Sequence, residues 1–211
     1  MKKKLLATVV AAAFAAAPNA FAADAAATAA PESESAQSKS LAIGDAAPAW
    51  KELTGVDDQR HSLADLGKAK AVAVVFTCNH CPVAQAYEDR IIELAADYKG
   101  KGVELVAINV NNLEADKLPA MKERAEEKGF KFVYLYDPSQ QIGREYGATV
   151  TPHAFLLDTK RHLAYVGAID DSMNPEKVTQ HYLRDAIDAV LIGSRPETDS
   201  TKPIGCGIQY E

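Results

Sequence analysis

Short runs of apolar residues alternate with amphipathic segments over most of the chain after residue 70. Residues 71–76 read Ala-Val-Ala-Val-Val-Phe, a continuous apolar run rich in β-branched side chains, which predicts a buried strand. Residues 82–99 have helical spacing and begin with Pro82, which suits the first turn of a helix because its missing N–H would be unpaired there. A second apolar run at residues 103–110 predicts another buried strand.

The alternation of strand-like and helix-like segments continues towards the C-terminus. The further segments are a helix at 118–128, a strand at 132–136, a helix at 140–146, strands at 154–157 and 163–166, and a helix at 176–191. Alternation of this kind, closed by a hairpin and a helix, predicts an α/β fold in which helices cover both faces of a central sheet.

The N-terminus has the pattern of a secretory signal peptide. Lysines occupy positions 2–4, an apolar stretch spans residues 5–17, and the small-residue cleavage pattern Ala-Phe-Ala follows at 20–22. We therefore expect a signal peptide at residues 1–22. The apolar stretch is too short to stay in a bilayer as an anchor, and no cysteine precedes residue 78 to carry a lipid. These features predict export to a bacterial periplasm, with no membrane anchor after cleavage.

Composition divides the exported part of the chain in two. Residues 23–40 are mainly Ala, Ser, Glu and Thr, which cannot bury enough apolar surface to fold, so we expect a flexible linker there. Residues 41–211 have the size of one domain. Loss of residues 1–22 removes three of the 23 basic residues and none of the 29 acidic ones. Acidic residues therefore outnumber basic ones by a wider margin in the exported chain than in the full chain. An acidic surface of this kind argues against nucleic acid or an anionic membrane as a partner.

Two cysteines lie where the strand at 71–76 runs into the helix at 82–99. The motif is Cys-Asn-His-Cys at residues 78–81. A helix N-terminus favours a thiolate, so we expect a low pKa for Cys78 and disulfide exchange that Cys81 resolves. A structural disulfide or half of a zinc site would have the same spacing, but the sequence has no second cluster to complete four zinc ligands. The context favours redox chemistry that requires no metal and no organic cofactor.

Four further segments narrow the fold class. They are the opening Ile-Gly-Asp-Ala-Ala-Pro-Ala-Trp at 43–50, the extra strand and helix within 103–128, Gly-Ala-Thr-Val-Thr-Pro at 147–152, and Gly-Cys-Gly-Ile at 205–208. Together with the cysteine motif, they resemble the thioredoxin fold and, within it, the redoxin branch. That branch includes peroxiredoxin-like proteins and periplasmic thiol–disulfide oxidoreductases. The resemblance implies a central mixed sheet flanked by helices, with an N-terminal extension and a redoxin-type strand–helix insertion.

The resemblance also implies roles for individual residues. Cys78 matches the nucleophilic thiol of the family, and Cys81 matches the resolving thiol. Pro152 matches the cis-proline that lies against the dithiol, and Thr151 matches the residue whose backbone groups bind the substrate chain. Cys206 is left as an odd thiol: it is a candidate third redox thiol, a site of intermolecular pairing or a packing cysteine.

His80 stands just before the resolving cysteine, as a histidine does in the oxidising thioredoxin-like proteins DsbA and protein disulfide isomerase. We expect its imidazole to stabilise the Cys78 thiolate and with it the reduced form, which makes the disulfide a stronger oxidant. A solvent-exposed histidine with no tuning role is the alternative. The buried acid that assists the resolving thiol in thioredoxin is missing, because Val72 occupies its position.

Two other functions would use the same part of the chain. Copper binding would draw on the two thiols of the motif, with His80 or His153 as a third ligand. A peroxidase would use Cys81 as its peroxidatic thiol. Peroxiredoxins carry a threonine three residues before that thiol, and Cys78 occupies this place here, while Thr77 is one position off.

Taken together, the sequence predicts a periplasmic thiol–disulfide oxidoreductase with a Cys78–Cys81 redox pair. Its expected partners are protein thiols or disulfides and a redox partner protein. We expect it to be a monomer or a weak oligomer.

Overall fold

Strand β3 (Ala71–Phe76) is the central strand of the fold, and every one of its residues is buried. It pairs in parallel with β4 (Val103–Asn109) and antiparallel with β7 (His153–Leu157). This computed structural model describes residues 41–211. The predicted signal peptide at 1–22 and the predicted linker at 23–40 lie outside the described residues.

One mixed sheet of seven strands organises the described part of the chain, in the order β2-β1-β5-β4-β3-β7-β8. Its outer strands are β1 (Leu53–Gly55), β2 (Arg60–His61), β5 (Val133–Tyr136) and β8 (Leu163–Gly167). β5 runs parallel to β4, whereas the β1–β2, β1–β5 and β7–β8 pairs are antiparallel. The predicted central mixed sheet flanked by helices is therefore confirmed.

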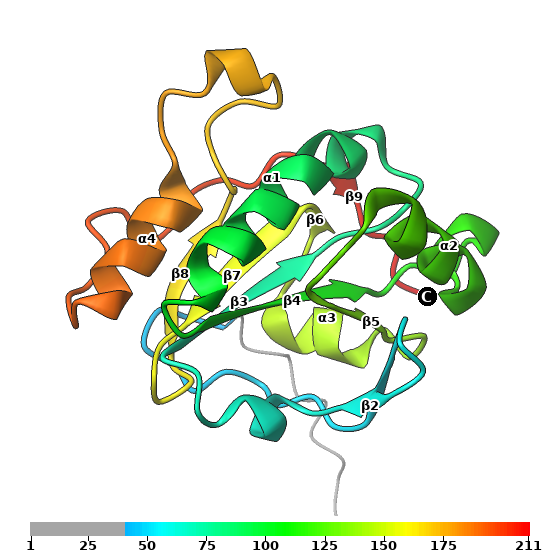
Figure 1. Cartoon of the computed structure of the whole chain (residues 1–211), viewed down its shortest axis with the longest axis horizontal. Coiled ribbons are helices and arrows are strands. Elements are labelled where there is room, and N and C mark those ends of the chain that lie inside the picture. The colour runs from blue at the N-terminus through cyan, green and yellow to red at the C-terminus, as the bar shows by residue number, and fades with distance from the viewer. Residues whose placement is uncertain (1–40) are drawn as a thin grey trace, which may run out of the picture. The chain divides into compact units, whose positions relative to one another are not determined.

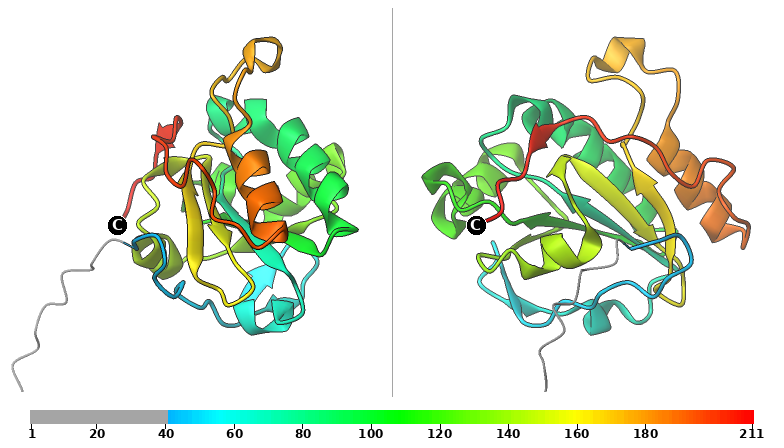
Figure 2. Two further views of the ribbon diagram at one scale, coloured as in Figure 1. Left: turned by 90° about the vertical axis from the view of Figure 1, so that its left-hand side faces the viewer. Right: turned by 180° about the vertical axis from the view of Figure 1, so that it is seen from behind.

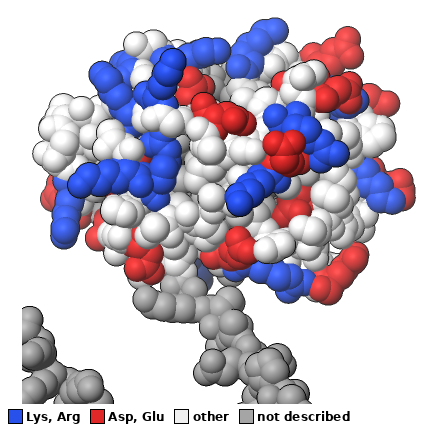
Figure 3. All heavy atoms as spheres, turned by 90° about the horizontal axis from the view of Figure 1, so that it is seen from below, with Lys and Arg blue, Asp and Glu red and all other residues white. Residues whose placement is uncertain are grey.

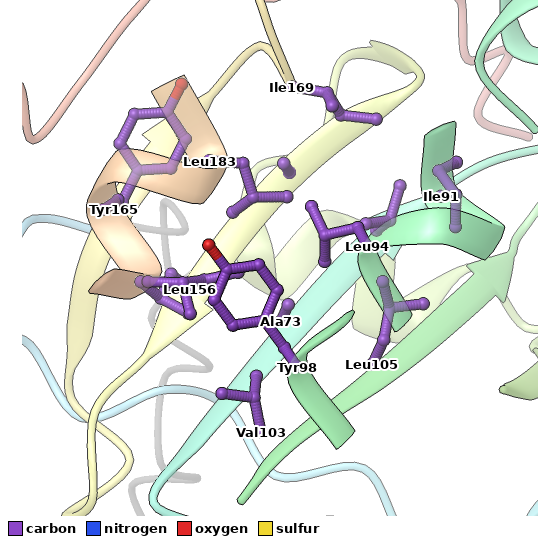
Figure 4. Close-up of a cluster of buried hydrophobic side chains, with 14 of the residues drawn as sticks. Ala73, Ile91, Leu94, Tyr98, Val103, Leu105, Leu156, Tyr165, Ile169 and Leu183 are labelled. Carbon is purple, nitrogen blue, oxygen red and sulfur yellow. The ribbon is translucent and has the colours of Figure 1, made fainter. Parts of the chain in front are cut away.

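Helices cover both faces of the sheet (Figure 1). On one face, α1 (Pro82–Lys99) and α4 (Tyr182–Leu191) bury a cluster that includes Ala73 of β3 (Figure 4). On the opposite face, α3 (Gln141–Tyr146) packs on the alternate residues of β3. The helix α2 (Leu118–Lys128) packs through Met121 and Ala125 against β4 and β5. Because β3 is covered on both faces, its sequence is a continuous apolar run.

The last helix is shorter than the pattern predicts. The expected helix at 176–191 begins only at Tyr182, after the short 3-10 turn η3 (Pro175–Lys177). Asp171 is the reason, because its carboxylate accepts hydrogen bonds from the backbone N–H (2.9 Å) and hydroxyl (2.5 Å) of Thr179. These bonds keep the segment before Tyr182 out of the helix, and Val178 within it has extended backbone angles.

Several short elements were not expected from the sequence. They are β1, β2, β6 (Val150–Thr151), β9 (Cys206–Gly207) and the 3-10 turns η1 (Leu63–Leu66) and η2 (Glu114–Asp116). Two or three residues are too few to show a hydrophobic period. The pairing of β6 with β9 forms a separate two-stranded sheet, and it matters for the site described below.

The surface carries charges of both signs. On the face shown in Figure 3, basic and acidic side chains are interspersed. Within residues 41–211, none of the helices has both the length and the apolar character needed to cross a membrane.

Candidate active site

The cysteine motif lies in the loop between the end of β3 and the start of α1. The backbone N–H of Thr77 donates to the carbonyl of Ile108 at 3.0 Å, so pairing with the neighbouring strand continues to the edge of the loop. Cys81 is the N-cap of α1, and its sulfur accepts a hydrogen bond from the N–H of Ala84 at 3.4 Å. The helix end therefore interacts directly with Cys81, and Cys78 lies three residues earlier.

Cys78 is buried, with 2% of its surface exposed, and is the free cysteine of the described chain. Its sulfur lies 3.0 Å from the hydroxyl oxygen of Thr151. The pKa of Cys78 is raised to about 11, because burial and the negative charge of Asp116 outweigh the Thr151 hydroxyl and the nearby backbone N–H groups, which lower it. The expectation of a low pKa is wrong for this form of the site, since desolvation of the thiolate outweighs the local donors.

The disulfide of the structure joins Cys81 to Cys206, across 125 residues of sequence and a Cα–Cα distance of 6.0 Å. The sequence predicts a Cys78–Cys81 redox pair, so the bond present here differs from that pair. The reason is the course of the C-terminal segment, whose strand β9 pairs antiparallel with β6 and sets Cys206 opposite Thr151. The candidate third thiol is thus within the cysteine site.

Thr151, which precedes Pro152 in the chain, contacts both cysteines of the motif. The peptide bond between Thr151 and Pro152 is cis, as predicted. The carbonyl oxygen of Thr151 lies 3.4 Å from the Cys81 sulfur. The side-chain hydroxyl of Thr151 contacts the Cys78 sulfur. The structure therefore brings together four of the residues that the sequence assigned to one site.

His80 interacts with a buried carboxylate that the sequence did not reveal. Its Nδ1 is hydrogen-bonded to Asp116, whose side chain is fully buried while that of His80 is 32% exposed. The same carboxylate accepts from the backbone N–H groups of Asn79 (2.7 Å) and His80 (3.3 Å). Since a carboxylate at Nδ1 holds the ring proton there, it orients the imidazole and leaves Nε2 as an acceptor in the neutral ring.

The sulfur of Cys78, a ring nitrogen of His80 and a carboxylate oxygen of Asp116 all lie within 4.8 Å of one another. A thiol, an imidazole and an orienting carboxylate are the groups found in nucleophile–base pairs with a third, positioning residue. Asp116 comes from the turn η2, beyond β4. One signal points towards it: β3 and β4 are parallel neighbours, so polar residues that follow them meet at the same sheet edge. No local motif marks the residue.

His153 and Cys81, which the copper and peroxidase alternatives would use, are engaged in other contacts in the structure. His153 is buried on β7, and its Nδ1 accepts from the N–H of Thr149 at 3.4 Å. Burial lowers the pKa of His153 to about 4, so the ring is neutral. Cys81 is held in its disulfide with Cys206. The third ligand that the copper alternative requires is therefore not His153 in this arrangement.

The mixed sheet, the cysteine motif at a strand–helix junction and the adjacent cis-proline define the class as a thioredoxin-fold thiol protein. A family model described as Redoxin matches residues 42–182, and the chain belongs to the redoxin family. The predicted family is confirmed.

One relative of known name agrees with this assignment, and two solved structures are similar to this chain. Thiol-disulfide oxidoreductase ResA of Bacillus thuringiensis (strain Al Hakam) is 30% identical over 123 residues, which are 58% of this chain and 68% of the relative. The crystal structure of a hypothetical protein from Sinorhizobium meliloti 1021 has 34% identity and a TM-score of 0.77, covering 82% of this chain and 97% of that one.

An uncharacterized conserved protein from Geobacillus kaustophilus is similar to the same extent. It has 37% identity and a TM-score of 0.76, covering 81% of this chain and 93% of that one. With the family and these relatives, we class the chain as an oxidoreductase.

Proposed function

We propose that the protein is a periplasmic thiol–disulfide oxidoreductase that exchanges disulfides with protein thiols through Cys78 and Cys81. One observation carries this proposal: both sulfurs contact Thr151, the residue before the cis bond to Pro152. A substrate cysteine held against that residue would lie beside both sulfurs of the motif. The relatives named thiol-disulfide oxidoreductase support the same chemistry.

In the exchange, a thiolate at Cys78 attacks a substrate disulfide and forms a mixed disulfide. Cys81 then attacks the Cys78 sulfur, forms the Cys78–Cys81 bond and releases the substrate as a dithiol; the reverse sequence oxidises a substrate. Thr151 supports the first step because its hydroxyl can donate to the thiolate. The buried N-cap position of Cys81 supports the second, since a helix N-terminus stabilises a thiolate.

His80 is proposed to accept the proton that Cys78 loses. Its ring lies near the Cys78 sulfur and is oriented by Asp116. Asp116 is thus a buried acid beside Cys78, and it comes from a different element than the one that carries Val72.

The proposed compartment rests on the pattern of residues 1–22, which resembles a secretory signal peptide. A periplasm permits stable disulfides, in agreement with the redox chemistry proposed. Expression of the full chain in a Gram-negative host, followed by osmotic release and N-terminal sequencing, tests this part. Recovery of a chain starting near residue 23 in the released fraction supports it, and retention of the intact chain in the cytoplasm contradicts it.

The test of function is equilibration of the exported protein in graded glutathione buffers, with alkylated cysteines read by mass spectrometry. We expect a Cys78–Cys81 disulfide to form. A potential of roughly −180 mV or higher would mark an oxidant or isomerase, as His80 suggests, and about −270 mV or lower would mark a reductase. If Cys78 never forms a disulfide with Cys81, the proposed exchange is wrong.

Peroxide reduction and copper binding remain as alternatives with distinct readouts. A peroxidase consumes hydrogen peroxide stoichiometrically with its thiols before any external disulfide is added. Copper binding would protect Cys78 and Cys81 from alkylation under reducing conditions when Cu(I) is present. Neither effect is expected from the exchange mechanism alone.

A further inference from the structure

The C-terminal segment returns from the end of α4 past β8 and on to β9, which pairs with β6 (Figure 2). It is fastened on both sides of Cys206. Before it, the Thr201 hydroxyl accepts from the N–H of Ala168 at 2.9 Å and lies 2.6 Å from the hydroxyl of Tyr165. After it, the Tyr210 hydroxyl donates to the carbonyl of Ala148 at 2.7 Å. We call the segment from Thr201 to Tyr210 the strap, because it is attached to the rest of the domain near both of its ends.

The middle of the strap pairs with the backbone of β6, the short strand that directly precedes the cis-proline. Strand β9 pairs with β6, so Cys206 stands opposite Thr151 and Gly207 opposite Val150. Gly205 approaches so closely that a Cβ atom there would lie 2.5 Å from the carbonyl carbon of Thr151 and closer still to its oxygen. Only glycine fits this contact, which means that the strap meets the edge backbone to backbone.

Cys206 also packs against the buried cluster of Cys78, Cys81 and Ala84. All three cysteines of the chain are therefore in one place: a disulfide between two of them and a free thiol beside it. A free thiol next to a disulfide is the arrangement from which internal exchange proceeds.

We propose that the C-terminal strap is a built-in peptide occupant of the substrate edge at Thr151, and that Cys206 exchanges its disulfide internally with Cys78. This inference rests on the proposed function, because it assigns the same edge and the same cysteines to an internal substrate. An external substrate peptide can pair with Thr151 only after β9 has left.

The exchange conserves electrons and needs no outside reagent. The Cys78 thiolate attacks the Cys81 sulfur, the Cys78–Cys81 bond forms, and the Cys81–Cys206 bond breaks. Cys206 leaves as a thiolate and takes up the proton that Cys78 lost. One disulfide and one thiol are present before and after the step. Its product is the Cys78–Cys81 pair of the proposed function together with a released strap.

The close contact at Gly205 offers a way to displace the strap without touching a cysteine. The variant Gly205→Ala places its methyl group against the backbone of Thr151, whereas Gly207→Ala is the matched control, since a Cβ at Gly207 meets nothing within 4 Å. Each oxidised protein is incubated without external thiol, quenched in acid, and its disulfide mapped by mass spectrometry.

We expect the wild type to contain both Cys81–Cys206 and Cys78–Cys81 forms. Gly205→Ala should shift the ratio towards Cys78–Cys81 by about tenfold, because overpacking destabilises the strapped form, and Gly207→Ala should match the wild type. Circular dichroism checks that each variant is folded. The inference is overturned if the Cys81–Cys206 form alone is found in the wild type and in folded Gly205→Ala, or if both glycine variants shift the ratio equally.

The variant Cys206→Ser keeps the inference testable should Gly205→Ala not fold, and it separates failure of the two proposals. We expect Cys206→Ser to form Cys78–Cys81 and to be alkylated at Cys78 faster than the wild type when reduced. If this disulfide forms in Cys206→Ser but never in the wild type, internal exchange is wrong while the proposed function stands. If it forms in neither, the proposed function itself is wrong.

Discussion

The hydroxyl oxygen of Thr151 lies 3.0 Å from the sulfur of Cys78, in a site where that thiol is almost fully removed from water. The same residue contacts the Cys81 sulfur through its carbonyl oxygen and stands opposite Cys206 through its backbone. A single residue of β6 thus contacts or faces all three cysteines. Its hydroxyl is a side-chain donor available to a Cys78 thiolate in a region where burial strongly opposes charge.

Removal of that hydroxyl in Thr151→Ala should raise the pKa of Cys78 further. A hydrogen bond to a charged group contributes about 1.5–3 kcal/mol, so alkylation of Cys78 at constant pH should slow roughly tenfold or more. Iodoacetamide labelling of the oxidised protein, followed by mass spectrometry, measures the rate. Thr149→Ala is the control, since its hydroxyl makes no bond to Cys78. Equal rates in the two variants would refute the assignment.

The buried Cys78 thiol should also show an unusual pH profile. With a pKa raised to about 11, its alkylation rate in the oxidised wild type should keep rising by about tenfold per pH unit through the range in which an ordinary cysteine levels off, about 8.5. Urea-unfolded protein provides the reference. A plateau in the folded protein at the ordinary value would show that burial does not control this thiol.

The charge of Asp116 raises the pKa of Cys78, so its removal should have the opposite effect. Asp116→Asn keeps an acceptor for the Asn79 N–H but removes the negative charge, and we expect Cys78 to be alkylated about tenfold faster at neutral pH. Glu114→Gln is the matched control, because Glu114 belongs to the same turn but its side chain is 89% exposed, where solvent screens the charge. An unchanged or slower rate in Asp116→Asn would contradict this electrostatic role.

His153 should make the fold sensitive to acid. Burial lowers the pKa of His153 to about 4 from an ordinary 6.5, so between these values the unfolded chain binds a proton that the folded chain does not. The resulting stability is fully present above pH 6.5 and is lost as pH falls towards about 4, at up to about 1.4 kcal/mol per pH unit. Urea unfolding at several pH values measures this slope. His153→Gln should flatten it, whereas His162→Gln on the partly exposed β7–β8 turn should leave it in place.

Gly167 should be essential for the strap's first attachment point. It has φ of +147°, and a Cβ there would lie 2.5 Å from the carbonyl oxygen of Thr201 and closer to its hydroxyl. We expect Gly167→Ala to lower the free energy of unfolding by about 2–4 kcal/mol, through backbone strain and overpacking. Gly100→Ala is the control, because Gly100 has φ of −67° and open space around it. A small loss in Gly167→Ala, equal to that of the control, would show that the strap gives way easily.

The local pattern of hydrophobic residues was sufficient to predict the main helices and strands. The apolar run of β3 and the helical spacing of α1 after Pro82 are visible because side chains on a buried strand or an amphipathic helix repeat with a fixed period. The position of the cysteine motif at their junction follows directly, and the family resemblance predicted the cis bond before Pro152.

The tertiary structure decided how the motif is completed. Cys206 reaches Cys81 across 125 residues, and Asp116 reaches His80 across 36, through turns and two-residue strands that leave no period in the sequence. The pKa of Cys78 shows the physical reason: the helix end nearby could be predicted, but the desolvation that outweighs it depends on which distant segments cover the thiol. Neighbours along the chain set the elements, while packing between distant segments sets the chemistry of the site.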